Sequence, residues 1–278
     1  MINSTTRSPL KWIGGKYHSA ERIVKAFPAP SLYDTYVEPC GGAAHVLFAK
    51  PAAKHREVFN DINGDLVNFW LQCRDNLEAL TSRLQSLPYA RAIYYTYYRS
   101  LFDGSEIEPL ERAVRWFYVL RSTGTGWIRK SPVGWNNSDS NIISYRMILE
   151  SFQQVQRRMA RVMIDNRDIR RIVEVYDSPR TLFYIDPPYI GAEHYYNQDA
   201  FDHEGLSQLL QHVKGSVALS YYPHNDLESW YPVHKWRRIT WEVQKVSAIH
   251  GETPSEIQTA TEMLLCNYPE AQDLWQSA

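Results

Sequence analysis

The chain has 278 residues, of which 44% are hydrophobic and 22% are charged, which is enough for a large core or for a core with one insertion. This composition excludes a disordered chain, and three cysteines are too few for a disulfide framework. No apolar run resembles a signal peptide or approaches the roughly 18 residues of a membrane helix. We therefore expect a cytoplasmic protein that makes no membrane contact.

The charges are sorted along the chain although they nearly cancel overall, to a formal net charge of −1. Residues 1–111 hold 12 basic and 12 acidic residues, residues 112–171 hold 12 and 4, and residues 172–278 hold 6 and 15. The basic middle part favours contact with a polyanion such as nucleic acid. The alternative is a solvated, Arg-rich helix face.

The first part of the chain alternates between strand and helix patterns. Short apolar runs at 32–37 and 57–60 are typical of strands, residues 43–49 begin a helix, and residues 65–87 have helical apolar spacing. The alternation resumes late, with strands expected at 181–185, 217–220, 233–239 and 262–266 and a helix at 206–213. This order predicts an α/β fold, a sheet with helices on both faces.

Residues 88–161 interrupt this alternation. They contain Tyr/Arg-rich helical patterns, a Gly/Ser/Asn-rich loop at 122–141 and a helix expected at about 144–159. We interpret them as an inserted, mainly helical domain. The main domain is then expected to comprise residues 1–87 and 162–278.

The most specific motif is Asp186-Pro187-Pro188-Tyr189, which directly follows the strand expected at 181–185. Two prolines fix φ and lack N–H groups, so a carboxylate, a carbonyl and an aromatic ring should stand where open α/β sheets bind ligands. An amine on a planar base could donate hydrogen bonds to the Asp186 carboxylate and the Pro187 carbonyl while its ring stacks on Tyr189. The alternative is a turn that stops the strand.

Two weaker motifs lie in the first half of the chain. Pro39, Gly41 and Gly42 lie in a strand-to-helix turn, where small residues either let the backbone approach a ligand or allow close packing. Asp61 follows the second expected strand, where an acid can accept hydrogen bonds from a ribose diol or cap a turn. Together with Asp186, these residues predict one pocket for a ribosyl cofactor and an amine acceptor.

In this order the motifs resemble those of the Dam-type DNA adenine-N6 methyltransferases. The resemblance rests on the segment KWIGGK at 11–16, Glu38-Pro39 with its glycines, Asn60-Asp61, Asp168 and the Asp-Pro-Pro-Tyr motif. It spans nearly the whole chain and implies a Rossmann-like S-adenosylmethionine-dependent methyltransferase sheet with an inserted target-recognition domain. The chain departs from the family pattern at Cys40, where Phe is common, and at Ala44, where Gly is frequent.

The resemblance also implies roles for individual residues. Asp186, Pro187 and Tyr189 would be catalytic. Trp12 would flank the cofactor's sulfonium group, Lys16 would reach its methionine carboxylate, and Asp168 with Ile169 would read its adenine. The full set expected to bind the cofactor is Trp12, Lys16, Pro39, Gly41, Gly42, Asp61, Asp168, Ile169 and Asp186.

The DNA contacts are expected from the insertion. The candidate residues are Arg121, Trp127, Arg129, Lys130, Trp135 and Asn136. Trp127 and Trp135 have an alternative role as core aromatics of the insertion. The loop lacks the Asn-Gly-Leu and Asn-Val-Pro segments of Dam itself, so no recognition sequence is assigned.

The leading hypothesis is a site-specific enzyme that transfers a methyl group from S-adenosylmethionine to N6 of a flipped-out adenine in double-stranded DNA. We expect a monomer without a metal site, and a cognate restriction endonuclease is a further candidate partner. Two alternatives remain: methylation of another amine, on cytosine N4 or an RNA adenine, and a catalytically idle DNA-binding relative.

Overall fold

The computed structural model describes residues 6–52, 56–123, 126–128, 140–193, 201–244 and 259–270. The chain divides into two compact units. The first comprises Met1–Gly15, Gly42–Ala52 and Asn63–Asn166, and the second comprises Lys16–Gly41, Ala53–Ile62 and Arg167–Ala278. No helix in the described ranges is long and apolar enough to cross a membrane.

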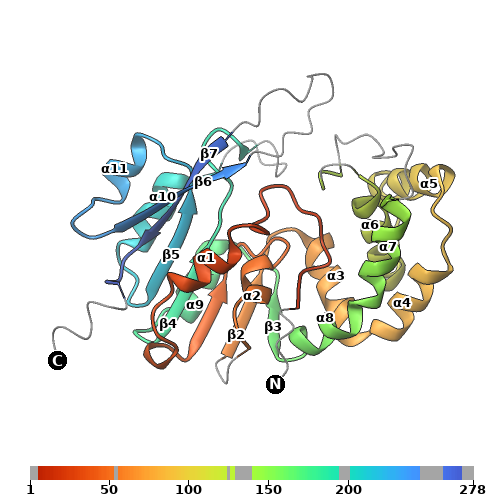
Figure 1. Ribbon diagram of the computed structural model, residues 1–278, viewed down its shortest axis with the longest axis horizontal. Helices are drawn as coiled ribbons and strands as arrows, with labels where there is room; N and C mark the ends of the chain where they lie inside the picture. Colours follow the sequence, from red (N-terminus) through yellow and green to blue (C-terminus); the bar gives the residue numbers. More distant parts are fainter. Residues whose placement is uncertain are drawn as a thin grey trace. The chain divides into compact units, whose positions relative to one another are not determined.

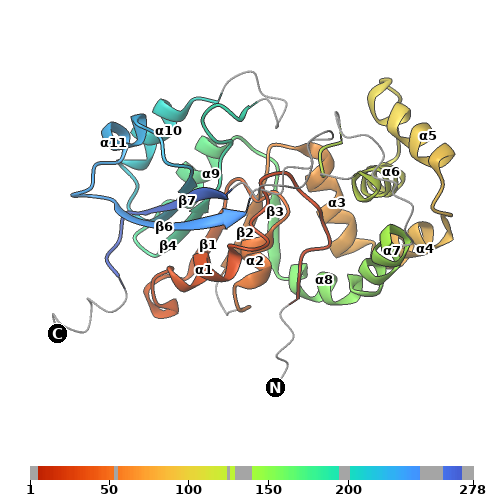
Figure 2. The ribbon, with the colours of Figure 1, turned by 45° about the horizontal axis from the view of Figure 1, so that its top comes forward.

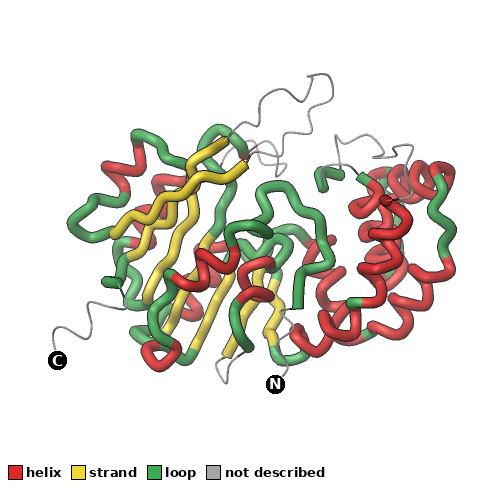
Figure 3. The backbone as a smooth tube through the Cα atoms, in the orientation of Figure 1, coloured by secondary structure: helices red, strands yellow, loops and turns green. Residues whose placement is uncertain are grey.

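Seven strands form a mixed sheet in the order β3-β2-β1-β4-β5-β7-β6. Strands β1, β2, β4 and β5 pair in parallel, whereas β7 is antiparallel to both β5 and β6. Figure 3 shows the strands as yellow tubes. Their bounds are β1 Thr35–Glu38, β2 Arg56–Asn60, β3 Val162–Asp165, β4 Thr181–Ile185, β5 Ser216–Tyr221, β6 Arg237–Gln244 and β7 Thr259–Cys266.

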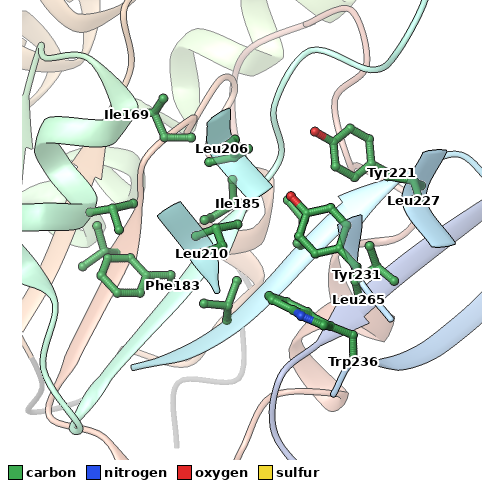
Figure 4. Close-up of a cluster of buried hydrophobic side chains, with 14 of the residues drawn as sticks. Ile169, Phe183, Ile185, Leu206, Leu210, Tyr221, Leu227, Tyr231, Trp236 and Leu265 are labelled. Carbon is green, nitrogen blue, oxygen red and sulfur yellow. The ribbon is translucent and has the colours of Figure 1, made fainter. Parts of the chain in front are cut away.

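The second unit has helices on both faces of its strands, as the sequence predicts (Figure 2). Helices α9, α10 and α11 pack on one face, where Phe183 and Ile185 of β4 meet Leu206 and Leu210 of α10 in a buried cluster (Figure 4). Helix α1 covers the other face. The bounds of these helices are α1 Ala20–Lys25, α9 Ile169–Tyr176, α10 His203–Leu210 and α11 Asp226–Trp230. Strand β4 is buried on both faces, which explains its continuous apolar sequence.

The first unit is mainly helical (Figure 1). Aromatic side chains pack between its helices. The Phe69 ring of α3 stacks on the Phe117 ring of α6 at a centroid distance of 5.0 Å, and Phe152 of α8 meets the Phe117 ring edge-on at 5.3 Å. The bounds are α2 His45–Ala49, α3 Gly64–Asp75, α4 Leu77–Ser86, α5 Arg91–Phe102, α6 Pro109–Ser122, α7 Ser140–Glu150 and α8 Phe152–Met159. The predicted insertion, 88–161, lies wholly within this unit, which also includes α3 and α4; its role as a separate recognition domain stays a prediction.

Several predicted boundaries were wrong for identifiable physical reasons. The single helix expected at 65–87 is two helices, because Asn76 leaves helical geometry at φ −130° and ψ 36°. The helix expected at about 144–159 is likewise two, which meet at Ser151. The strand expected at 233–239 starts only at Arg237, because a turn in which Trp236 N–H donates to the Pro232 carbonyl precedes it. Strand β3 and the short helices α1 and α11 were not predicted.

Candidate functional site

The second unit brings three predicted acids to the carboxyl edge of its parallel strands. Asp61 directly follows β2, Asp186 directly follows β4, and both strands pair in parallel with β1. Asp168 is the N-cap of α9, where its side chain accepts a hydrogen bond from Arg170 N–H and is 57% exposed. Parallel strands have their carboxyl ends at the same edge of a sheet. Residues that follow such strands are therefore expected to lie close together.

Cys40, in the turn after β1, shows that these carboxylates converge. Burial raises the pKa of the Cys40 thiol well above its ordinary value, and the negative charges of Asp61, Asp186 and Asp168 raise it further. A charge shifts a pKa in this way only from nearby. The three predicted acids therefore all lie in the neighbourhood of Cys40.

Asn60, the last residue of β2, holds this edge together. Its fully buried side chain donates to the carbonyls of Pro39, at 2.8 Å, and Arg167, at 2.9 Å. Its Oδ1 accepts a hydrogen bond from Arg167 N–H at 2.8 Å. Asn60 thus ties the turn after β1 to the segment before α9. The sequence analysis gave Asn60 no role of its own, because its partner at Arg167 is 107 residues away.

Asp186 lies in a buried cluster of charges. Its Oδ2 is 2.8 Å from Lys16 Nζ, and the same nitrogen lies 3.8 Å from Glu262 Oε1. The side chain of Lys16 is 4% exposed and that of Asp186 is 17% exposed. Lys16, which was predicted to reach the cofactor's carboxylate, is therefore paired with Asp186 in this structure; its cofactor role stays a prediction.

The pKa values of Asp186 and Lys16 are both raised, for different reasons. Burial raises the pKa of Asp186 above its ordinary value, Lys16 opposes this rise, and the Glu262 carboxylate adds to it. Burial alone would lower the pKa of Lys16, but the Asp186 and Glu262 carboxylates outweigh burial and raise it. Asp186 Oδ1 is buried and lacks a hydrogen bond of normal geometry within the described part of the chain, while the nearby Tyr189 hydroxyl lowers the pKa of Asp186. This oxygen can still accept a hydrogen bond from a ligand.

Two tyrosines stand beside Asp186. Tyr189 is buried, and Lys16 Nζ lies 4.8 Å from the centroid of its ring. Tyr222, directly after β5, meets the Tyr189 ring edge-on at a centroid distance of 4.5 Å and is 36% exposed. Because Lys16 lies over the Tyr189 ring, Tyr222 offers the more accessible aromatic surface. The sequence analysis missed Tyr222, although an aromatic residue at the end of a strand was a usable signal.

The neighbouring glycines of the turn have different surroundings. A Cβ on Gly41 would collide with the Phe59 ring of β2, which supports the close-packing alternative. Gly42 has φ +49°, and its Cβ would stand 3.1 Å from the indole of Trp12, in the first unit. Pro39 and Pro187 are both buried. Ala44 also has a left-handed φ, of 57°, at the position where the family pattern has Gly.

The first unit contains a pair of partly buried cations. Arg121, at the C-terminal end of α6, is 9% exposed, and its Nη2 donates to Ser144 Oγ at 2.9 Å. Burial lowers the pKa of Arg121 to about 10. Burial and the Arg121 charge also lower the pKa of Lys11. Tyr89 and Tyr145 offset part of the lowering at Arg121, but no carboxylate among the described residues raises the pKa of Arg121 or of Lys11.

The remaining predicted residues are placed unevenly. Ile169 is buried in the core cluster of the second unit, where it packs with the sheet. Trp127 is half-buried in the first unit. Arg129, Lys130, Trp135 and Asn136 lie outside the described residues. Among the residues that the structure describes, no group of His, Cys, Asp and Glu side chains could hold a metal ion.

Comparison with known proteins identifies the family. The family model described as "D12 class N6 adenine-specific DNA methyltransferase" matches residues 12–244. The chain belongs to this family. This assignment confirms the fold class and the adenine-specific DNA methyltransferase activity that the sequence motifs predict.

Curated relatives agree with the assignment. The type II methyltransferase M1.LlaDCHI of Lactococcus lactis subsp. cremoris is 27% identical over 71% of this chain and 70% of its own length. The DNA adenine methylase of Haemophilus influenzae is 30% identical over 43% of this chain and 42% of its own length. The DNA N-6-adenine-methyltransferase of Escherichia phage P1 is 24% identical over 66% of this chain and 24% of its own length.

Proposed function

We propose that this D12-class methyltransferase uses S-adenosylmethionine and methylates N6 of an adenine flipped out of double-stranded DNA. The carboxyl edge of the second unit fits this cofactor chemically. Asp61 can accept hydrogen bonds from a ribose diol, and the acids around Cys40 suit a positively charged sulfonium group. When bound, S-adenosylmethionine supplies an electrophilic methyl group whose bonding electrons leave with sulfur.

Asp186 Oδ1 is the observation that carries the proposal. A buried carboxylate oxygen without a hydrogen bond loses free energy unless a donor reaches it. An adenine amine is such a donor, and the Pro187 carbonyl can accept its second hydrogen. Two accepted hydrogen bonds draw the nitrogen lone pair out of the ring, so the nitrogen attacks the methyl carbon. The methylated nitrogen then releases one proton, and Asp186 can accept it because its pKa is raised.

DNA binding is assigned to the cationic pair of the first unit. Lys11 and Arg121 are both desolvated, and no carboxylate in the described part of the chain compensates them. A DNA phosphate would provide the missing negative charge and release counterions. Flipping the base out of the duplex costs a few kcal/mol, which such contacts must offset. The monomeric state and a cognate restriction endonuclease stay predictions.

Methylation of unmethylated genomic DNA with S-[methyl-³H]adenosylmethionine tests this function. The DNA is digested to nucleosides, and the label is expected in N6-methyladenine. Label in N4-methylcytosine, or label only when an RNA replaces DNA, would move the function to another amine. A folded protein that binds DNA but incorporates no label would support the idle DNA-binding alternative.

A further inference from the structure

Glu262 of β7 is a second buried carboxylate beside Asp186, and the proposed mechanism gives it no part. It is 7% exposed and lies opposite Trp241 of β6 in the antiparallel register. Its Oε2 accepts a hydrogen bond from Ser19 Oγ at 2.7 Å. Trp241 Nε1 in turn donates to Ser19 Oγ at 3.1 Å. These two contacts fix the carboxylate, so its other oxygen, Oε1, faces Lys16.

Lys16 is thereby placed between two carboxylates. Its Nζ is 2.8 Å from Asp186 Oδ2 and 3.8 Å from Glu262 Oε1. One cation between two anions leaves this buried cluster with an excess negative charge. A cation held by a single carboxylate would neutralise that carboxylate more fully and weaken it as an acceptor.

We propose that Glu262 is a positioning residue for methyl transfer: it holds Lys16 between the two carboxylates, so that Asp186 keeps its strength as an acceptor for the target amine. This inference rests on the proposed function, in which Asp186 Oδ1 receives the amine. Glu262 touches neither the base nor the methyl donor and acts only through Lys16 and Asp186. Glu262 itself follows no motif.

The other groups around Asp186 do not replace this effect. Burial raises the pKa of Tyr184, Tyr221 and Tyr222, so these hydroxyls stay neutral at physiological pH. Burial likewise keeps the Cys40 thiol neutral. Tyr189 contributes its ring, which lies beside Lys16, and a hydroxyl whose hydrogen bond lowers the pKa of Asp186. Asp61 and Asp168 raise the pKa of Cys40 and are not among the causes that shift the pKa of Asp186, whereas Glu262 is the carboxylate that shares Lys16 with Asp186.

The test is the pH dependence of the single-turnover rate for Glu262→Gln, at saturating DNA and S-adenosylmethionine. Gln keeps the shape of the side chain and removes its charge. Lys16 then neutralises Asp186 more fully, so the acidic limb of the profile is expected to move down by about one pH unit. The matched control is Glu242→Gln on β6, whose exposed carboxylate accepts a hydrogen bond from Thr261 Oγ1; its profile should match that of the unaltered protein.

An unmoved or upward-moved acidic limb in Glu262→Gln would overturn the inference. If that variant does not fold, Glu262→Asp replaces it, since Asp keeps the charge but moves it away from Lys16 by one methylene. A smaller downward shift of the acidic limb then supports the inference, and no shift overturns it. ¹³C NMR of labelled aspartate, with the Asp186 signal assigned by its loss in Asp186→Asn, gives the same readout without turnover. If the unaltered protein places no label on adenine, the proposed function is wrong. The NMR titration of Asp186 still tests the role of Glu262 separately.

Discussion

The two units bury charge in opposite ways. In the second unit, Lys16 lies between Asp186 and Glu262, so the buried cation is compensated within the protein and the cluster keeps an excess negative charge. In the first unit, Arg121 and Lys11 are desolvated, and no carboxylate of the described chain raises their pKa. A compensated cluster can carry out acid–base chemistry, whereas an uncompensated cationic pair is suited to an external anion. Burial of a charged side chain alone therefore does not define a catalytic site. What distinguishes the two sites is whether the opposite charge is supplied by the protein or by a ligand.

The largest expected effect is on catalysis, in Asp186→Ala. This variant removes the acceptor for the target amine but leaves the other eight residues expected to hold the cofactor. The single-turnover rate should fall by about 10³-fold, as for the loss of one preorganised stabilising group. Calorimetry should show S-adenosylmethionine binding largely unchanged. Lost cofactor binding together with residual transfer would contradict the role given to Asp186.

The next largest effect is on DNA binding, in Arg121→Met. This substitution keeps an apolar side chain and removes the charge. The lowered pKa of Arg121, about 10, corresponds to a destabilisation on the order of 3 kcal/mol at neutral pH, because each pKa unit is about 1.4 kcal/mol. The variant should bind DNA about tenfold more weakly, with a salt slope smaller by about 1. At the same time its free energy of unfolding should rise by about 1–3 kcal/mol.

This opposite movement of stability and DNA affinity separates a binding role from a structural one. The stability gain should stay constant up to about pH 9 and shrink as the pH rises above 10, since the unaltered protein then loses the unfavourable charge of Arg121 as well. The control is Arg83→Met, because Arg83 is half-exposed and already paired with Glu111 Oε2 at 2.8 Å. A variant of Arg121 that is less stable and binds DNA normally would refute the assignment.

In the unaltered enzyme, the methylation rate and DNA binding should depend differently on pH. Asp186 must be ionised to accept the amine, and burial raises its pKa. The rate should therefore fall, as the pH decreases, at a higher pH than an exposed aspartate with a pKa near 3.9 would give. DNA binding through Arg121 and Lys11 should be constant over this range, because both cations stay protonated. Filter binding and single-turnover rates at each pH measure the two quantities separately.

The smallest expected effect is on stability, at Gly41 in the turn after β1. Gly41→Ala places a Cβ against the Phe59 ring, so overpacking should lower the free energy of unfolding by about 1–3 kcal/mol. Phe59→Leu should restore part of that loss in the double variant, which urea unfolding would show. If Gly41→Ala instead weakened cofactor binding without changing stability, the ligand-approach interpretation of this glycine would be the better one.

The sequence predicted those parts of the site that depend on local pattern. Strand β4 was identified because it is buried on both faces and reads as an apolar run, and the parallel order then placed Asp61 and Asp186 at one edge. Glu262 was missed because its contacts are long-range: Ser19 is 243 residues away. The break at Asn76 was missed because neither Gly nor Pro marks it. Charge compensation, which distinguishes the two units, is a property of contacts that no motif records.

The separation of catalysis from DNA binding is tested most directly by measuring both quantities in Asp186→Ala and in Arg121→Met. Each variant is assayed for its DNA dissociation constant and for its single-turnover methylation rate at saturating DNA. The account predicts that Asp186→Ala loses about 10³-fold in rate and keeps its DNA affinity, whereas Arg121→Met loses DNA affinity and keeps its rate within about twofold. Equal losses of both quantities in both variants, or the reverse assignment, would contradict it.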